Sequence, residues 1–132
     1  MNILVIDGMG GGIGKSIIEQ IKSNIDNAII TAVGTNSIAT SSMLKSGAHK
    51  SATGENAVVY NAAKADYIIG VIGIIAANAM HGEVSPKMAE AVTSSPAHKI
   101  LVPMEKCNIT VAGVENAPIQ TYINDIIKKI SS

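Results

Sequence analysis

Apolar and polar residues follow two patterns along the chain, and each pattern predicts one kind of element. Continuous apolar runs are typical of strands buried on both faces of a parallel sheet. They predict strands at residues 3–6, 28–33, 67–71, 99–102 and 109–112. Apolar residues that recur every three or four positions indicate amphipathic helices. They predict helices at residues 13–24, 37–46, 56–64, 86–94 and 119–130, and they leave residues 48–55 as a loop.

The order of these elements predicts the fold. Strands that alternate with helices are typical of βαβ units, so we expect an α/β fold: a three-layer, Rossmann-like, doubly wound domain with a mostly parallel sheet of about five strands. The gap between residues 102 and 109 is too short for a helical crossover. One of the last two strands is therefore either an antiparallel edge strand or a wrongly assigned element. No repeat or linker divides residues 1–132, and a single domain is expected.

Composition and charge narrow the expected partners. The chain carries ten basic and ten acidic residues, for a formal net charge of zero, whereas binders of nucleic acids or membrane surfaces usually carry an excess of Lys and Arg. The apolar stretch at residues 67–80 is too short to span a bilayer. A lone cysteine, Cys107, and a start without a basic leader indicate a cytoplasmic protein. Neither nucleic acids nor membranes are expected partners.

Glycines gather where the first predicted strand gives way to the first helix. This segment, residues 8–14, is called the glycine loop; its glycines are Gly8, Gly10, Gly11, Gly12 and Gly14. A loop that leaves a strand and enters a helix directs unpaired N–H groups and the positive end of the helix dipole at one place. Glycine also lets an anion approach the backbone closely. The segment therefore predicts an anion-binding loop.

The spacing Gly8-x-x-x-Gly12-Ile13-Gly14 resembles the cofactor loop of short-chain dehydrogenases, a Rossmann subclass. The resemblance covers about the first quarter of the chain and implies an NAD(P)-like nucleotide ligand. The residues expected to hold it are Asp7, Gly8, Gly10, Gly11, Gly12, Ile13, Gly14, Thr35, Asn36, Gly70 and Gly73. The chain departs from the pattern at Asp7, where that family usually has Thr. It also departs after the second predicted strand, where Thr35 and Asn36 replace the carboxylate that holds a ribose of NAD.

The same family carries out catalysis with a Tyr-x-x-x-Lys pair, and Tyr60 and Lys64 have this spacing. In the family the pair lies far downstream, whereas here it precedes the third predicted strand. We therefore interpret Tyr60 and Lys64 as an ordinary pair one helical turn apart, and the catalytic residues stay unknown.

A second template fits the same residues. Gly11-Gly12-Ile13-Gly14-Lys15-Ser16 resembles the deviant P-loop of ParA- and MinD-like ATPases, which implies an ATP- or GTP-binding domain as the alternative. A P-loop ATPase also needs an aspartate at a strand end for Mg²⁺, but the strands expected there end in Gly34 and Gly70. ATP hydrolysis therefore ranks below dinucleotide binding.

Taken end to end, the chain resembles an uncharacterised family of short bacterial proteins. The stretches that match are residues 6–8 with the glycine loop, 34–36, 52–56, 69–74 and 86–91. That family carries no established activity, so it supplies no reaction. A further alternative is a non-enzymatic sensor or assembly module, since the chain is short for a dehydrogenase with its own substrate pocket. A homodimer would supply such a pocket. No metal site is expected, because the three histidines lie far apart in the sequence.

Overall fold

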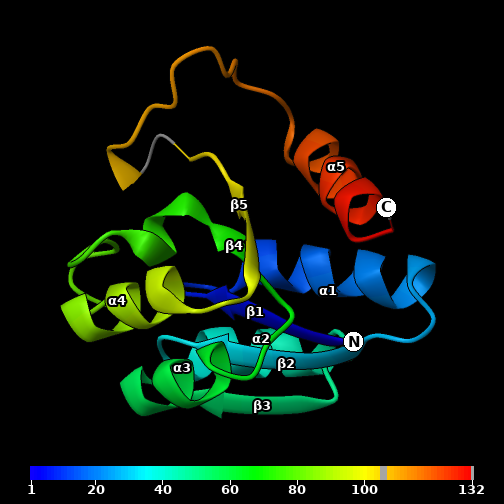
Figure 1. Ribbon diagram of the computed structural model, residues 1–132, viewed down its shortest axis with the longest axis horizontal. Coiled ribbons are helices and arrows are strands. Elements are labelled where there is room, and N and C mark those ends of the chain that lie inside the picture. The colour runs from blue at the N-terminus through cyan, green and yellow to red at the C-terminus, as the bar shows by residue number, and fades with distance from the viewer. Residues whose placement is uncertain (105–106, 132) are drawn as a thin grey trace.

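Strands and helices alternate along most of the computed structural model, which describes residues 1–104 and 107–131 (Figure 1). The elements are β1 (Asn2–Asp7), α1 (Gly12–Asn24), β2 (Ile29–Gly34), α2 (Ser37–Lys45), β3 (Lys50–Thr53), α3 (Glu55–Ala62), β4 (Tyr67–Val71), the 3₁₀ helix η1 (Ile72–Ile75), α4 (Pro86–Ser94), β5 (His98–Val102) and α5 (Ile119–Ser131). The strand at 67–71 and the helix at 86–94 begin and end where the sequence predicts.

The five strands form one parallel sheet in the order β3-β2-β1-β4-β5. From the central strand β1, the chain first builds outward through β2 and β3. It then crosses back to place β4 and β5 on the other side of β1. The strand order thus reverses between β1 and β4. This is the Rossmann-like, doubly wound α/β architecture that the sequence predicts.

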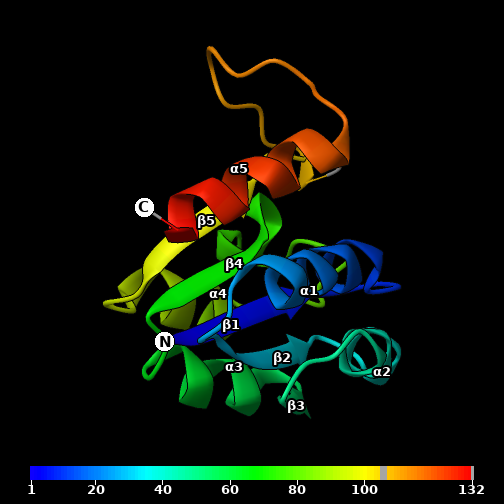
Figure 2. The same cartoon turned by 90° about the vertical axis from the view of Figure 1, so that its right-hand side faces the viewer.

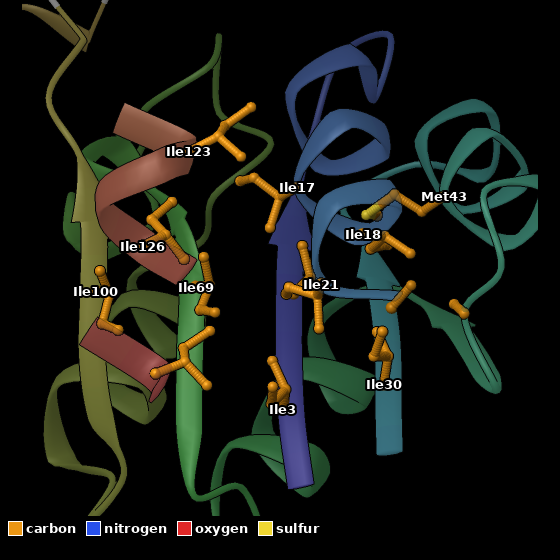
Figure 3. Packing of buried hydrophobic residues seen from close by; sticks show 14 of the residues in the cluster. Ile3, Ile17, Ile18, Ile21, Ile30, Met43, Ile69, Ile100, Ile123 and Ile126 are labelled. Atoms are coloured by element: carbon orange, nitrogen blue, oxygen red, sulfur yellow. The ribbon is translucent and has the colours of Figure 1, made fainter. Parts of the chain in front are cut away.

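Side chains alternate between the two faces of the sheet and produce two separate cores. Ile3 and Val5 of β1 belong to the core on the face covered by α1, α2 and α5, together with Ile17 of α1 and Ile123 of α5. Figures 2 and 3 show these helices and the isoleucines between them and the sheet. Leu4 and its neighbours on the same side of β1 face α3 and α4. Since the central strands β1, β2 and β4 are apolar on both sides, the helices exclude water from the middle of the sheet.

The sequence prediction is wrong for two strands. Residues 50–53, expected in a loop, form the edge strand β3, although Lys50-Ser51-Ala52-Thr53 contains no apolar run. The edge position explains this, because an edge strand needs hydrogen bonds to only one neighbour, and β2 supplies them. Thr53 also shares a hydrogen bond of 2.7 Å with Thr40 of α2.

Residues 109–112, expected to form a strand, are irregular. They belong to a segment, residues 108–118, that loops away from the sheet in both views and is called the arm (Figures 1 and 2). The β-branched residues Ile109, Thr110 and Val111 favour a strand in isolation, but no described strand pairs with them. The gap between residues 102 and 109, too short for a helical crossover, is thus explained: residues 109–112 form no strand, so no crossover has to connect them to β5.

Candidate functional site

Three loops meet at the carboxyl ends of β1 and β2, the edge of the sheet where open α/β folds bind ligands. They are the glycine loop after β1, the Thr35–Asn36 turn after β2, and the segment after η1 that carries Glu83. The last of these crosses from β4 over the end of β1 to reach β2. The strand order reverses between β1 and β4, so this place is the topological switch point of the fold.

Asp7 fastens the glycine loop to the end of β1. Its side chain is buried, and its two oxygens accept hydrogen bonds from the N–H groups of Gly8, at 2.8 Å, and of Gly14, at 2.6 Å. Burial raises the pKa of Asp7 above its ordinary value of 3.8, the two N–H groups oppose that rise, and the nearby charge of Glu83 adds to it. The carboxylate is therefore engaged with its own loop and serves as an internal cap of α1.

Glu83 ties the three loops together. Its Oε1 accepts hydrogen bonds from Thr35 Oγ1 at 2.5 Å, Asn36 Nδ2 at 2.9 Å and the Met9 N–H at 3.1 Å. These donors, with that of Thr35 first, lower the pKa of Glu83 below its ordinary value of 4.5, so the side chain is ionised at neutral pH. Asn36 has a second task, because its Oδ1 accepts the Ala39 N–H and begins α2.

The glycines of the loop fall into two sets. A Cβ at Gly14 would lie 2.6 Å from Met43 Sδ, one at Gly8 would lie 2.6 Å from Thr35 Oγ1, and one at Gly11 would lie 2.8 Å from the Ala39 backbone. Gly11 also has φ +75°, a conformation that disfavours side chains. At Gly10 and Gly12, by contrast, no atom lies within 4 Å of the place where a Cβ would be. The packing of the described chain thus requires the first set and leaves the second facing open space.

The open glycines coincide with open backbone donors. The N–H of Gly11 bonds to Gly8 O, and those of Gly8, Met9 and Gly14 bond to the two carboxylates. The N–H groups of Gly10, Gly12 and Ile13, by contrast, donate no hydrogen bond to any atom of the described residues, 1–104 and 107–131. Gly12 and Ile13 begin α1, where the helix dipole favours an anion.

A groove with a volume of about 830 Å³ lies between the first half of α1 and the full length of α2, and it reaches Gly10 of the glycine loop. Lys15 and Lys45 give it positive charge, and Glu19 gives it one negative charge. The remaining lining residues are Gly10, Ser37, Ile38, Ser41 and Ser42. Hydroxyl groups, lysines and unpaired N–H groups together suit a ligand that is both anionic and polar.

The remaining predicted site residues lie away from the groove. Gly70 lies within β4, where a Cβ would meet the Ile6 carbonyl oxygen at 2.6 Å. Gly73 lies in η1, where a Cβ would meet Cys107 Sγ at 2.5 Å. Close packing therefore accounts for both glycines. Sequence reasoning did not select Lys45, Ser41 or Glu83, because each is separated from the glycine loop by dozens of residues and belongs to no motif.

Tyr60 and Lys64 do form a pair, at 2.5 Å between Oη and Nζ. The hydrogen bond and the charge of Lys64 lower the pKa of Tyr60. Helix α3 starts beside the carboxyl end of β3 and runs back toward the start of β4, so this pair lies at the amino-terminal edge of the sheet. The structure thus places the pair away from the switch point.

The fold and this edge define a Rossmann-like α/β domain with a glycine loop at its switch point. Residues 2–132 match the model of the family described as Domain of unknown function (DUF3842), and the chain belongs to that family. The predicted resemblance to an uncharacterised family is confirmed to that extent.

Among solved structures, the chain is similar to a dodecameric FMN-dependent UbiX-like decarboxylase from Escherichia coli O157:H7. The TM-score is 0.51 and the identity 13%, over 99% of this chain and 76% of that chain, so the similarity is one of fold. No curated protein matches the chain. Within the described residues, no helix has the length and apolar character needed to cross a membrane.

Proposed function

We propose that this protein binds a phosphate-bearing nucleotide, with the phosphate on the N–H groups of Gly10, Gly12 and Ile13 and on Lys15. The observation that carries the proposal is the open space at Gly10 and Gly12. Nothing in the described chain packs against these positions, and neither has the positive φ that would favour glycine. An approaching ligand gives a reason for glycine at both.

The groove supports the same ligand class. Ligand pockets commonly have volumes of about 300–1,000 Å³, and the groove between α1 and α2 lies within that range at about 830 Å³. Lys15 and Lys45 offset the negative charge of a phosphate, which the buried carboxylate of Asp7 would otherwise repel. Asp7 is moreover engaged with Gly8 and Gly14 and leaves the outer N–H groups free for the ligand.

NAD(P) is the nucleotide that the loop spacing favours, and FMN is the one named for the decarboxylase of similar fold. Calorimetric titration with NADH, NADPH, FMN, ADP and ATP distinguishes them. Binding of ATP that requires Mg²⁺ would instead favour the P-loop alternative.

Lys15→Ala tests the assignment of the phosphate. We expect the nucleotide to bind about fivefold more weakly, since one charged contact to the phosphate is lost. The matched control is Lys22→Ala, which removes a lysine from the far end of α1 and should leave the affinity unchanged. Absence of binding by every nucleotide at millimolar concentration would refute the proposed function.

A homodimer is the assembly that we propose for this domain. The arm exposes two valines, Val111 at 39% and Val114 at 48%, on a segment that extends away from the sheet. A second copy of the chain would cover them. Light scattering should give twice the monomer mass for the wild type and the monomer mass for Val114→Ser. A wild-type monomer would refute the dimer without affecting nucleotide binding.

A further inference from the structure

We infer that Glu83, which adjoins the groove, is the specificity-determining residue of the nucleotide site, and that its free carboxylate oxygen accepts hydrogen bonds from the vicinal hydroxyls of a ribose. The inference narrows the ligand from a phosphate-bearing nucleotide to a ribonucleotide with an intact 2′,3′-diol. This inference rests on the proposed function, because it concerns the sugar of the nucleotide whose phosphate the glycine loop holds.

The two oxygens of Glu83 are unequally used. Oε1 receives all three of the hydrogen bonds from Thr35, Asn36 and the Met9 N–H. Oε2 receives none from the described residues. A carboxylate accepts about four hydrogen bonds in all, so the orientation of Glu83 is set by one oxygen while the other remains available.

The position of Glu83 corresponds to the carboxylate that the sequence lacks. In NAD-binding Rossmann domains an acidic residue at the end of the second strand holds the ribose hydroxyls. Here β2 ends at Gly34, followed by Thr35 and Asn36. The carboxylate that contacts these two residues comes from the segment after η1, some fifty residues further along the chain.

Glu83 also lies beside the proposed phosphate contacts. It holds Met9 and Asn36, and the residues that follow these two in sequence, Gly10 and Ser37, line the groove. Glu83 is not one of the described residues that line the groove, but it adjoins them. A ligand that extends from the groove past Gly10 and Ser37 would therefore have N–H groups and Lys15 on one side and the Glu83 carboxylate on the other. Only the first of these favours an anion, whereas the second favours a neutral hydrogen-bond donor such as a hydroxyl.

The backbone before Glu83 adopts a costly conformation. Asn78, Met80 and His81 have φ values of +68°, +57° and +57°, in the left-handed region that side chains disfavour. Such strain persists only where the surrounding structure holds it, and it is concentrated at functional sites. The hydrogen bonds of Glu83 are among the contacts that hold this segment over β1.

The experiment compares ADP with 2′,3′-dideoxy-ADP by calorimetry on the full chain. We expect the wild type to bind the dideoxy analogue about tenfold more weakly, because a hydrogen bond to a charged group is lost. In Glu83→Gln the two ligands should bind within about twofold of each other, through weaker binding of ADP. Glu83→Asp withdraws the carboxylate by one methylene while keeping the charge, and should lose the discrimination too. Glu90→Gln makes the same charge change on the exposed side of α4 and should retain it.

The other outcomes contradict either the inference about Glu83 alone or the inference together with the proposed function. If ADP binds and Glu83→Gln keeps the tenfold preference, the inference is wrong and the proposed function stands. The same holds if the wild type does not distinguish the two ligands, or if it binds FMN but not ADP. Tighter binding of ADP by Glu83→Gln would mean that Glu83 occupies the place of the phosphate. If no nucleotide binds to the wild type, the proposed function fails together with the inference.

Discussion

The glycine loop has an inner side and an outer side, and the two sides contain glycine for different reasons. On the inner side, Gly8, Gly11 and Gly14 lie so close to α2, Met80 or Asp7 that a methyl group would collide with them. On the outer side, Gly10 and Gly12 face open space next to a groove lined by lysines and serines. Packing of the fold explains the inner set, and it leaves the outer set to be explained by a ligand. A single loop thus combines a structural and a functional requirement for the same residue type.

The largest effect is expected on the inner side. Gly11→Ala combines a left-handed φ of +75° with a contact of 2.8 Å to the backbone of Ala39, which cannot rotate away as a side chain can. We expect the free energy of unfolding to fall by about 3 kcal/mol, measured by urea denaturation. Gly10→Ala, with no atom within 4 Å, is the control and should be near neutral. Equal stability of the two variants would contradict the division of the loop.

Asp7→Asn removes the carboxylate that holds the inner side. An amide can accept only one of the two N–H groups, and its own NH₂ faces the other, so we expect a loss of about 2 kcal/mol at neutral pH. The pKa of Asp7 is raised in the folded state, so its contribution to stability is fully present below its ordinary value of 3.8 and is lost as the pH rises through the folded value. The difference in stability between wild type and variant should therefore widen toward acid. Urea denaturation from pH 3 to pH 7 measures it, and a difference that narrows toward acid would contradict the burial of this charge.

Gly12→Ala sharpens the comparison through a small effect of opposite sign. Gly12 is the first residue of α1, and alanine restricts the unfolded chain more than glycine, so the variant should gain about 0.5 kcal/mol. Its affinity for the nucleotide should nevertheless fall about tenfold, because the new methyl group occupies the approach of the phosphate. Thermal unfolding and calorimetry check the two effects separately. A stabilised variant with unchanged affinity would place the ligand elsewhere.

The sequence permitted prediction of most of the fold because its patterns are local. The isoleucines of α1 and α5 recur at helical spacing, and Ser85 and Pro86 mark the start of α4 with a cap and a residue suited to the first turn. The strand β3 was missed because its pairing with β2, and not its composition, creates it. The arm was misread for the converse reason, since Val111 and its neighbours favour a strand that lacks a partner.

The candidate site could be predicted only as far as its motif extends. The glycine loop is contiguous, and Asn36 directly follows the second predicted strand, so both were selected. Which glycines lie on the inner side and which on the outer side depends on where α2 packs against the loop. The spacing of the glycines in the sequence does not contain this information. Glu83 was overlooked because it contacts Thr35, after β2, only through a turn in which Met80 and His81 adopt left-handed backbone conformations. Methionine and histidine do not predict such a conformation from the sequence.

The most direct test of the central claim is a titration of ¹⁵N-labelled protein with ADP, followed by NMR of the backbone amides. The account predicts that the amide signals of Gly10, Gly12, Ile13 and Lys15 shift most, with smaller changes along the groove at Ser37 and Ser41. The amides of Gly8 and Gly14, which are bound to Asp7, should move little. If ADP, NADH, NADPH and FMN at millimolar concentration all leave the signals of the glycine loop unshifted, or if the shifts gather on the arm or around Tyr60, the account is contradicted.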